Sequence, residues 1–388
     1  MKRFPINISD FSTIIQEDYL YVDKTRSIYD LITQGKFYFL TRPCRFGKTL
    51  LLSTLKELFE GNRKLFKGLW IDSSNYIWDK HTVILLNFSS IASSSPEKLE
   101  QSLALDLQLQ AKKLSYDLSD ITNPGDKLKA FVSYVTQKNK KVVILIDEYD
   151  HPIVNNIDNL KVVEGNTKVI NDFFAVIKGL GSSLRALFIT GITQASKSSL
   201  FSELTTITNI SLKPVASTLL GYTQEELMTY FKEDLTGLAK LNNKTEEEML
   251  GEVQEWCGGF RFSKLNDKVY NPFSLHYLFA NLEFVNHWFS SATPPFLVKL
   301  LKKTDCTLRV MDGGEVSEDT LSSLQIERPK ALSLLFQTGY LTIESYNELL
   351  RSYSLIIPNR EVKHSYMSLF TVLVSDVKDL NSFVARLF

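Results

Sequence analysis

The sequence predicts an α/β fold, in which a core with a five-stranded parallel sheet is followed by a helical lid and a small winged-helix-like C-terminal unit. Three observations predict it. In the first half of the 388 residues, apolar runs of strand length alternate with helical patterns, as they do in parallel sheets. Two of these runs end in clusters of charged and hydroxyl side chains. From about residue 215 the sequence changes to capped helices.

The first cluster lies in residues 38–52, which predict a strand, a tight loop and a Leu-rich helix that begins just after Lys48 and Thr49. This pattern is typical of a phosphate-binding P-loop, where Lys48 would reach the terminal phosphates and Thr49 would ligate Mg²⁺. However, Arg42 stands where the motif has its first Gly, and Pro43 follows it, so the loop has less backbone freedom than usual. Taken alone, the pattern equally fits a helix N-terminus with a surface lysine. The residues expected to bind the nucleotide are Pro43, Cys44, Arg45, Phe46, Gly47, Lys48, Thr49 and Leu50.

The second cluster favours the P-loop interpretation. Five aliphatic residues precede Asp147 and Glu148, which is the pattern of a Walker B strand that carries two carboxylates at its end. Asp147 is expected to hold Mg²⁺ through coordinated waters, and Glu148 to orient and deprotonate the attacking water. Asp150 is expected to cap a solvated turn, with an extension of the metal shell as the alternative. The two motifs together are far less expected by chance than either alone.

Three more apolar runs complete the predicted sheet. They lie at residues 83–88, 185–194 and 207–212, and helices are expected at 97–116, 126–138 and about 169–180. In a P-loop ATPase the strand beside Walker B carries a polar side chain near the γ-phosphate. Thr190 is the expected residue, with Thr193 and Gln194 as reserves; the alternative is that Thr190 is an ordinary strand former.

Sequence patterns also indicate the places of the N-terminal segment and of the second half of the chain. Residues 1–36 are expected beside the nucleotide base by analogy with other P-loop ATPases, or simply to pack on the core. Capping boxes at Thr223 and Thr245 begin helices of the lid. Arg261 is expected to be an ordinary surface residue, with a phosphate contact as the alternative. The predicted domains are the ATPase core 1–214, the lid 215–298 and the winged-helix-like unit 299–388.

The amino-acid composition narrows the possible classes of protein and of binding partner. Lys plus Arg equals Asp plus Glu, at 44 each, so net charge does not support a nucleic-acid or anionic-membrane partner. The three cysteines are far apart, which argues against a disulfide framework or a zinc site. Cys44 is expected to be a small filler residue, with a redox-sensitive thiol as the alternative. With no secretory signal or membrane-spanning run in the sequence, a cytoplasmic protein is expected.

Several blocks together resemble a bacterial AAA-ATPase-like family whose members often carry a C-terminal PD-(D/E)xK-type nuclease. In that family the P-loop also replaces its first Gly with an Arg-Pro pair, so the resemblance implies that Arg42 and Pro43 are family features. Cys44 departs from the family's usual basic residue. Residues 357–363 resemble the junction before the nuclease, and Glu361-x-Lys363 is not taken as that enzyme's own motif, so the ATPase part alone is expected. The blocks are residues 4–11, 21–25, 41–49, 146–150 and 270–274.

The function expected from these motifs is an ATP-binding, Mg²⁺-dependent ATPase that acts as a nucleotide-driven switch. One alternative is a regulator or scaffold that binds the nucleotide without hydrolysing it. Another is a nucleic-acid-binding module that uses basic residues of the C-terminal unit. A homo-oligomer or a separate effector protein is the expected partner, with no membrane involvement. The basic residues are Lys299, Lys302, Lys303, Arg309, Arg328 and Lys330.

Overall fold

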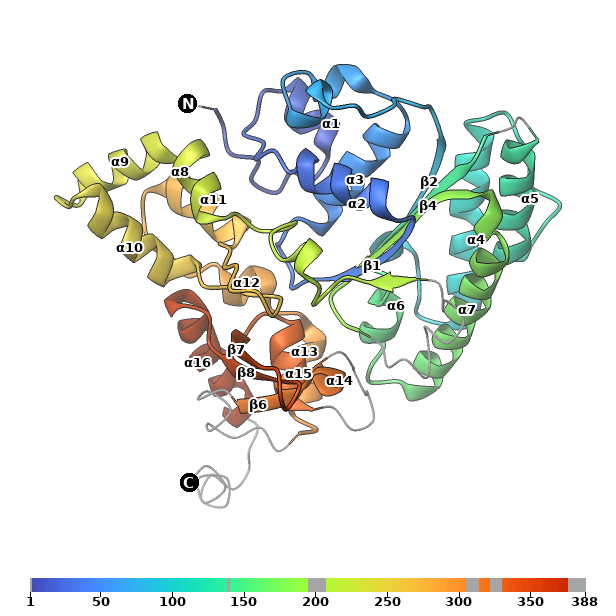
Figure 1. Cartoon of the computed structure of the whole chain (residues 1–388). Helices are drawn as coiled ribbons and strands as arrows, with labels where there is room; N and C mark the ends of the chain where they lie inside the picture. The colour runs from blue at the N-terminus through green and yellow to red at the C-terminus, as the bar shows by residue number, and fades with distance from the viewer. Residues whose placement is uncertain (1, 138–139, 195–206, 305–313, 322–329, 376–388) are drawn as a thin grey trace.

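A parallel sheet of five strands lies at the centre of the protein (Figure 1). The structure is a computed structural model and describes residues 2–137, 140–194, 207–304, 314–321 and 330–375. The strand order is β2-β3-β4-β1-β5, and every neighbouring pair is parallel. The predicted α/β core is therefore confirmed. The strands are β1 (Phe37–Thr41), β2 (Thr82–Asn87), β3 (Val142–Asp147), β4 (Leu184–Gly191) and β5 (Thr208–Asn209).

Both faces of this sheet are covered, because alternate residues of β1, β2, β3 and β4 belong to different apolar clusters. In β3, Val143 and Leu145 pack on the face that carries α3 (Lys48–Phe59), while Ile144 and Ile146 pack on the opposite face. The strand is buried along its whole length. Such burial explains its continuous aliphatic sequence, since neither face meets water.

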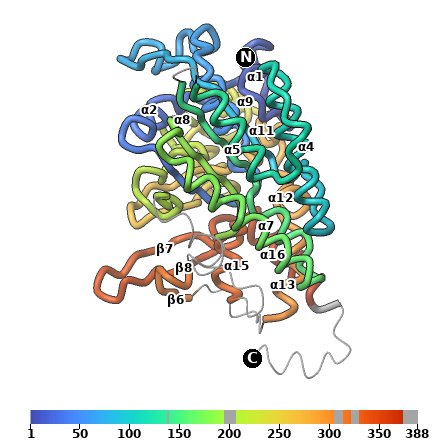
Figure 2. The backbone as a smooth tube through the Cα atoms, turned by 90° about the vertical axis from the view of Figure 1, so that its right-hand side faces the viewer, coloured from blue at the N-terminus to red at the C-terminus, as the bar shows by residue number. Residues whose placement is uncertain are grey.

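The second face is covered by three helices that lie side by side (Figure 2). Two of them begin clearly earlier than the sequence pattern indicates. One begins at Pro124 rather than at residue 126, and the last begins at Leu160 rather than near residue 169. Pro is favoured in the first turn of a helix, where its missing N–H has no partner to lose. The helices are α4 (Pro96–Lys112), α5 (Pro124–Thr136) and α7 (Leu160–Gly179), and the short α6 (His151–Val154) precedes the last.

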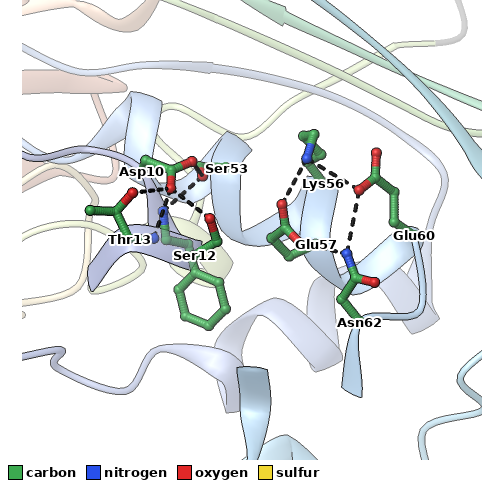
Figure 3. Close-up of polar contacts among 9 residues, drawn as sticks. Asp10, Ser12, Thr13, Ser53, Lys56, Glu57, Glu60 and Asn62 are labelled. Atoms are coloured by element: carbon green, nitrogen blue, oxygen red, sulfur yellow. Dashed lines mark hydrogen bonds and ion pairs between the residues drawn. The ribbon is translucent and has the colours of Figure 1, made fainter. Parts of the chain in front are cut away.

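The N-terminal segment is attached to the P-loop helix by a small polar cluster (Figure 3). Asp10 caps α1 (Phe11–Gln16) by accepting a hydrogen bond from the Thr13 amide. Its second oxygen accepts one from the Ser53 hydroxyl on α3, and the Phe11 amide donates to the same hydroxyl. The segment then continues through α2 (Thr25–Gln34) into β1. These contacts hold the N-terminal segment, residues 2–36, against the helix that begins at the candidate site.

A group of helices follows the core and lies apart from the sheet in Figure 1. Two of them begin at the predicted capping boxes of Thr223 and Thr245, and both boxes are formed. They share an apolar cluster that also includes Val22 of the N-terminal segment. The helices are α8 (Gln224–Tyr230), α9 (Lys232–Leu241), α10 (Glu246–Cys257) and α11 (Pro272–Asn281), and α12 (Trp288–Ala292) comes next.

The C-terminal unit combines a small antiparallel sheet with helices, as predicted. Its strand order is β6-β8-β7, with β6 (Gly314–Ser317), β7 (Thr342–Asn347) and β8 (Ser352–Ile356). The helices are α13 (Pro295–Leu301), α14 (Glu318–Leu321), α15 (Ala331–Gln337) and α16 (Arg360–Ser375). The domain boundaries at residues 214 and 298 stay predictions. Among the described residues, no helix combines the length and apolar character that a membrane span needs.

Candidate nucleotide-binding site

The loop between β1 and α3 has the backbone of an anion-binding turn. Gly47 has φ of +91° and precedes the first residue of the helix, Lys48. A Cβ there would meet no atom within 4 Å, so its backbone angle, rather than crowding, favours glycine. Arg45 also has a positive φ, of +66°. The unpaired N–H groups of the first turn of α3 therefore begin at this loop, which makes it a suitable phosphate site.

A cavity of about 460 Å³ lies over this loop. Of the eight residues expected to bind the nucleotide, all except Pro43 line it. Tyr21 and Val22 line it from the N-terminal segment, and Tyr222 and His276 from the lid. The N-terminal segment thus lies beside the loop, while its place next to a nucleotide base stays a prediction.

Thr49 and the end of β3 meet beside the cavity. The Thr49 hydroxyl donates a hydrogen bond of 2.7 Å to Asp147 Oδ2, and the Thr190 hydroxyl donates one of 2.5 Å to Asp147 Oδ1. Thr49 lines the cavity, whereas Asp147 and Thr190 lie behind it and are buried. Three predicted site residues from α3, β3 and β4 therefore form one hydrogen-bonded chain.

Glu148 lines the cavity directly after this chain. Its φ of +49° lies in the left-handed region, which is unfavourable for a residue with a long side chain. Its amide donates a 3.1 Å hydrogen bond to Asp147 Oδ1. Backbone strain of this kind costs on the order of 1–3 kcal/mol and is found most often at functional sites. It turns the second carboxylate of the motif toward the cavity while the first stays behind Thr49.

Lys48 is buried at the loop, and its ammonium group is engaged by the loop itself. Nζ donates hydrogen bonds of 2.9 Å to the carbonyls of Arg42 and Pro43. The side chain lines the cavity. Two of the three N–H donors of the ammonium group are thus engaged within the loop, so Lys48 turns fully to a ligand only when these carbonyls are released.

Arg42 is not a phosphate contact in this structure. Its guanidinium is buried and donates to the backbone carbonyls of Thr41, Ser211 and Ala216. Burial lowers the pKa of Arg42 to about 9. The arginine thus fastens the start of the loop to the segment after β5, in place of the flexible glycine of the usual motif.

The prediction for Asp150 is wrong, because this residue is buried rather than solvated. It accepts hydrogen bonds from the Ile192 amide and from the amide and hydroxyl of Thr193. Burial raises the pKa of its carboxyl, although the Thr193 hydrogen bonds oppose the shift. The sequence did carry one signal of this close packing, namely the glycine at position 191 of the strand. A Cβ on Gly191 would come within 2.7 Å of Asp150 Oδ1.

Neither of the reserve residues, Thr193 and Gln194, which follow β4, lines the cavity. Thr193 is bound to Asp150. The Gln194 side chain donates to the Thr41 hydroxyl and accepts from the Asn209 side chain. The backbone amide of Gln194 donates to the side chain of Gln337 in the C-terminal unit. Gln194 therefore belongs to a buried polar network between β1, β5 and α15.

Both expectations for Arg261 are wrong. The side chain is neither on the surface nor among the residues that line the cavity. Its guanidinium donates to four backbone carbonyls, those of Ser263, Lys264, Leu265 and Glu344, and so fastens a lid turn to β7. The burial of this arginine cannot be recognised from sequence, because its partner on β7, Glu344, is distant along the chain.

Two cavity residues have protonation states that follow from burial. Burial raises the pKa of the Cys44 thiol, which keeps it protonated and disfavours the redox-sensitive alternative. Burial lowers the pKa of His276 to about 3, so its ring is neutral near pH 7, and Nε2 shares a 3.0 Å hydrogen bond with the Tyr222 hydroxyl. The lid side of the cavity is thus uncharged at the rings of His276 and Tyr222.

The chain belongs to the AAA-ATPase-like family described as predicted AAA-ATPase, whose match covers residues 5–201. This range contains the loop, Walker B strand and Thr190. A similar protein of Azotobacter chroococcum mcd 1, an uncharacterized protein in the vnfD 5' region, is 33% identical over 370 residues. The match covers 94% of this chain and 69% of that protein. The family resemblance is confirmed, while the association with a nuclease stays an expectation.

Two solved structures show a low similarity to this chain. The ORC2 protein of Aeropyrum pernix, in ADPNP–ADP complexes, gives a TM-score of 0.29 at 13% identity and covers 91% of this chain and 92% of that one. Drosophila ORC bound to poly(dA/dT) DNA and Cdc6 gives a TM-score of 0.29 at 12% identity, with 94% and 60% covered. At these scores the likeness carries no conclusion about this chain.

Proposed function

We propose that this protein binds ATP in the cavity and hydrolyses it with Mg²⁺, as a nucleotide-driven switch. The observation that carries the proposal is the hydrogen-bonded chain from Thr49 through Asp147 to Thr190, beside the buried Lys48 at a helix N-terminus. A family described as predicted AAA-ATPase supports the same class of ligand. Backbone N–H groups of the loop and the Lys48 ammonium would bind the phosphates.

The oxygen atoms beside the cavity fit a magnesium ion. Mg²⁺ prefers hard oxygen ligands and keeps several of its waters, and the Thr49 hydroxyl and an Asp147 carboxylate oxygen lie 2.7 Å apart. When bound, the ion would neutralise charge on the transferring phosphoryl group. Thr190 is a positioning residue in this scheme, because its hydroxyl fixes Asp147. Glu148 would orient the attacking water and accept its proton.

Phosphate release from ATP tests this assignment through Glu148→Gln. The substitution keeps the size of the side chain and removes the proton acceptor, so turnover is expected to fall by about 10²- to 10⁴-fold, while ATP still binds. The matched control is Glu100→Gln, which makes the same change at an exposed position of α4. Equal turnover of Glu148→Gln and the native chain would exclude Glu148 as the base.

One observation favours the alternative of a regulator that does not hydrolyse ATP. Lys48 is held by the carbonyls of Arg42 and Pro43, and Arg42 is itself fastened to the segment after β5. A loop held in this way can bind a nucleotide without reaching the geometry for hydrolysis. ATP binding by the native chain, with phosphate release no faster than in buffer, would select this alternative.

No described contact favours the nucleic-acid alternative. Lys299 forms an ion pair with Asp158, and both side chains are exposed. Arg309 and Arg328 lie outside the described residues. A homo-oligomeric state and a separate effector likewise stay proposals, which mass measurement in solution with and without ATP and Mg²⁺ addresses.

A further inference from the structure

The P-loop of this protein carries large side chains, and these pack on the lid and the C-terminal unit. Phe46 is 1% exposed. Its ring lies 4.9 Å from that of Phe260 and 5.2 Å from that of Phe262, both edge to face, and 6.5 Å from that of Trp288. Phe260 stacks on Trp288 at 5.3 Å. Aromatic pairs at these distances attract one another through their ring edges and faces, beyond the burial of their surface.

Arg42 contacts the same aromatic group from the other end of the loop. Its guanidinium carbon lies 4.3 Å from the centre of the Phe262 ring, within the range of a cation–π interaction. Phe262 thus contacts two loop residues, Arg42 and Phe46. We call the set of Phe46, Phe260, Phe262 and Trp288 the aromatic clamp.

The remaining loop side chains have contacts outside the core as well. Gly339, which follows α15 and has φ of +83°, leaves so little space that a Cβ would lie 2.9 Å from Pro43 Cβ and 2.7 Å from the Trp288 ring. Arg45 donates a 3.2 Å hydrogen bond to the Ser291 carbonyl in α12, and its guanidinium lies 4.8 Å from the ring centre of Phe273. The loop is therefore held from one end to the other by residues distant in sequence.

This packing bears on how the loop can move. Lys48 donates to the carbonyls of Arg42 and Pro43, which are the residues held by Phe262 and by the Gly339 turn. If Lys48 turns to a phosphate, these carbonyls lose their partner and the peptides that carry them shift. Because packed interiors rearrange between discrete arrangements rather than deform continuously, such a shift repacks the aromatic clamp.

We infer that Phe46 is a positioning residue that couples phosphate binding in the loop to the lid and the C-terminal unit through the aromatic clamp. This inference rests on the proposed binding of ATP. In a glycine-rich loop the backbone moves without side chains to transmit the motion. Here the loop acts on its neighbours directly, so the replaced glycine and the bulky loop residues provide the mechanical step of the switch.

Hydrogen exchange in the presence and absence of Mg-ATP tests the coupling in the full chain. In the native protein, ATP is expected to change exchange both in the loop, residues 41–50, and in two clamp segments, residues 260–263 and 288–292, by at least about fivefold, the low end of ordinary coupling between sites. In Phe262→Leu, whose side chain does not line the cavity, the loop is expected to respond as before, while the change in the clamp segments is lost.

The matched control is Phe131→Leu, because Phe131 is also 1% exposed but packs on the opposite face of the sheet. This variant should retain the response of both regions. If Phe262→Leu fails to fold, Phe260→Leu removes another ring that contacts Phe46 from the lid side and is expected to give the same loss.

The outcomes separate the inference from the proposed function. No change anywhere with ATP contradicts both. A change in the loop of the native protein without one in the clamp segments contradicts the inference alone. A clamp response in Phe262→Leu equal to that in Phe131→Leu contradicts it as well.

Discussion

At the scale of single residues, Thr190 shows how the site positions its charges. Its hydroxyl is fully buried and contacts Asp147 rather than the cavity. A hydrogen bond to a charged group contributes about 1.5–3 kcal/mol. Asp147 Oδ1 also accepts from the Glu148 amide, and Oδ2 from Thr49. The orientation of this carboxylate, and with it the proposed Mg²⁺ site, depends on the threonine.

Thr190→Val removes the hydroxyl with almost no change of volume. We expect it to lower the affinity for Mg²⁺ in the presence of ATP while ATP binding in EDTA is retained, because Asp147 loses one of the groups that orient it. Thr190→Ser, which keeps the hydroxyl, should restore most of the affinity. Titration of Mg²⁺ against a fixed amount of ATP measures the effect. Equal Mg²⁺ affinities in Thr190→Val and the native chain would contradict the positioning role.

We expect the buried carboxyl of Asp150 to make the free energy of unfolding depend on pH. Burial raises the folded-state pKa above the usual 3.8, so the folded state binds this proton more tightly than the unfolded state. Its favourable contribution is complete below pH 3.8 and is lost as the pH rises through the raised pKa. Relative to Asp150→Asn, the native chain should lose stability over that range. Urea unfolding of both proteins across the range measures this, and a constant difference in free energy would contradict it.

At the scale of elements, the short helix α1 determines where the N-terminal segment lies. Asp10 caps this helix and also accepts the hydrogen bond from Ser53 on α3. The ion pair of Lys24 with Glu226, at 2.6 Å, then joins the segment to α8. The cavity wall formed by this segment is therefore fixed at both the P-loop helix and the lid.

Asp10→Ala removes the cap and the contact with α3. It is expected to lower the free energy of unfolding by about 0.5–2 kcal/mol, the usual cost of losing an N-cap. Asp10→Ser keeps a capping oxygen on a shorter side chain and should recover the larger part of the loss. Urea unfolding compares the three proteins; a loss in Asp10→Ser as large as in Asp10→Ala would show that the cap contributes little.

The elements and the motif residues could be predicted from local patterns, whereas the buried polar contacts could not. The aliphatic run of β3 and the Gly-Lys-Thr sequence carry their signals within a few residues. By contrast, Arg42, Asp150 and Arg261 are assigned by partners that are distant or not implied by their neighbours, such as Ser211, Thr193 and Glu344. Local sequence gives the chemistry of such side chains but not the tertiary contacts that bury them.

At the scale of the whole molecule, one apolar cluster extends from the P-loop helix to the C-terminal unit. It includes Leu52 of α3, the clamp residue Trp288, and Leu355 of β8. The Gln194 network, which ends at Gln337 on α15, gives a second connection between the core and that unit. Binding at the loop is thus placed to affect distant elements, which is what a nucleotide-driven switch requires.

Equilibrium binding of ATP to the native chain and to Lys48→Ala tests the central claim most directly. The claim is that the cavity binds a triphosphate through its loop. We expect saturable, Mg²⁺-enhanced binding by the native chain and a large loss of affinity in Lys48→Ala, with Lys98→Ala, an exposed lysine on α4, binding as the native chain does. Undetectable binding by the native chain, or equal affinity in Lys48→Ala, would contradict the claim.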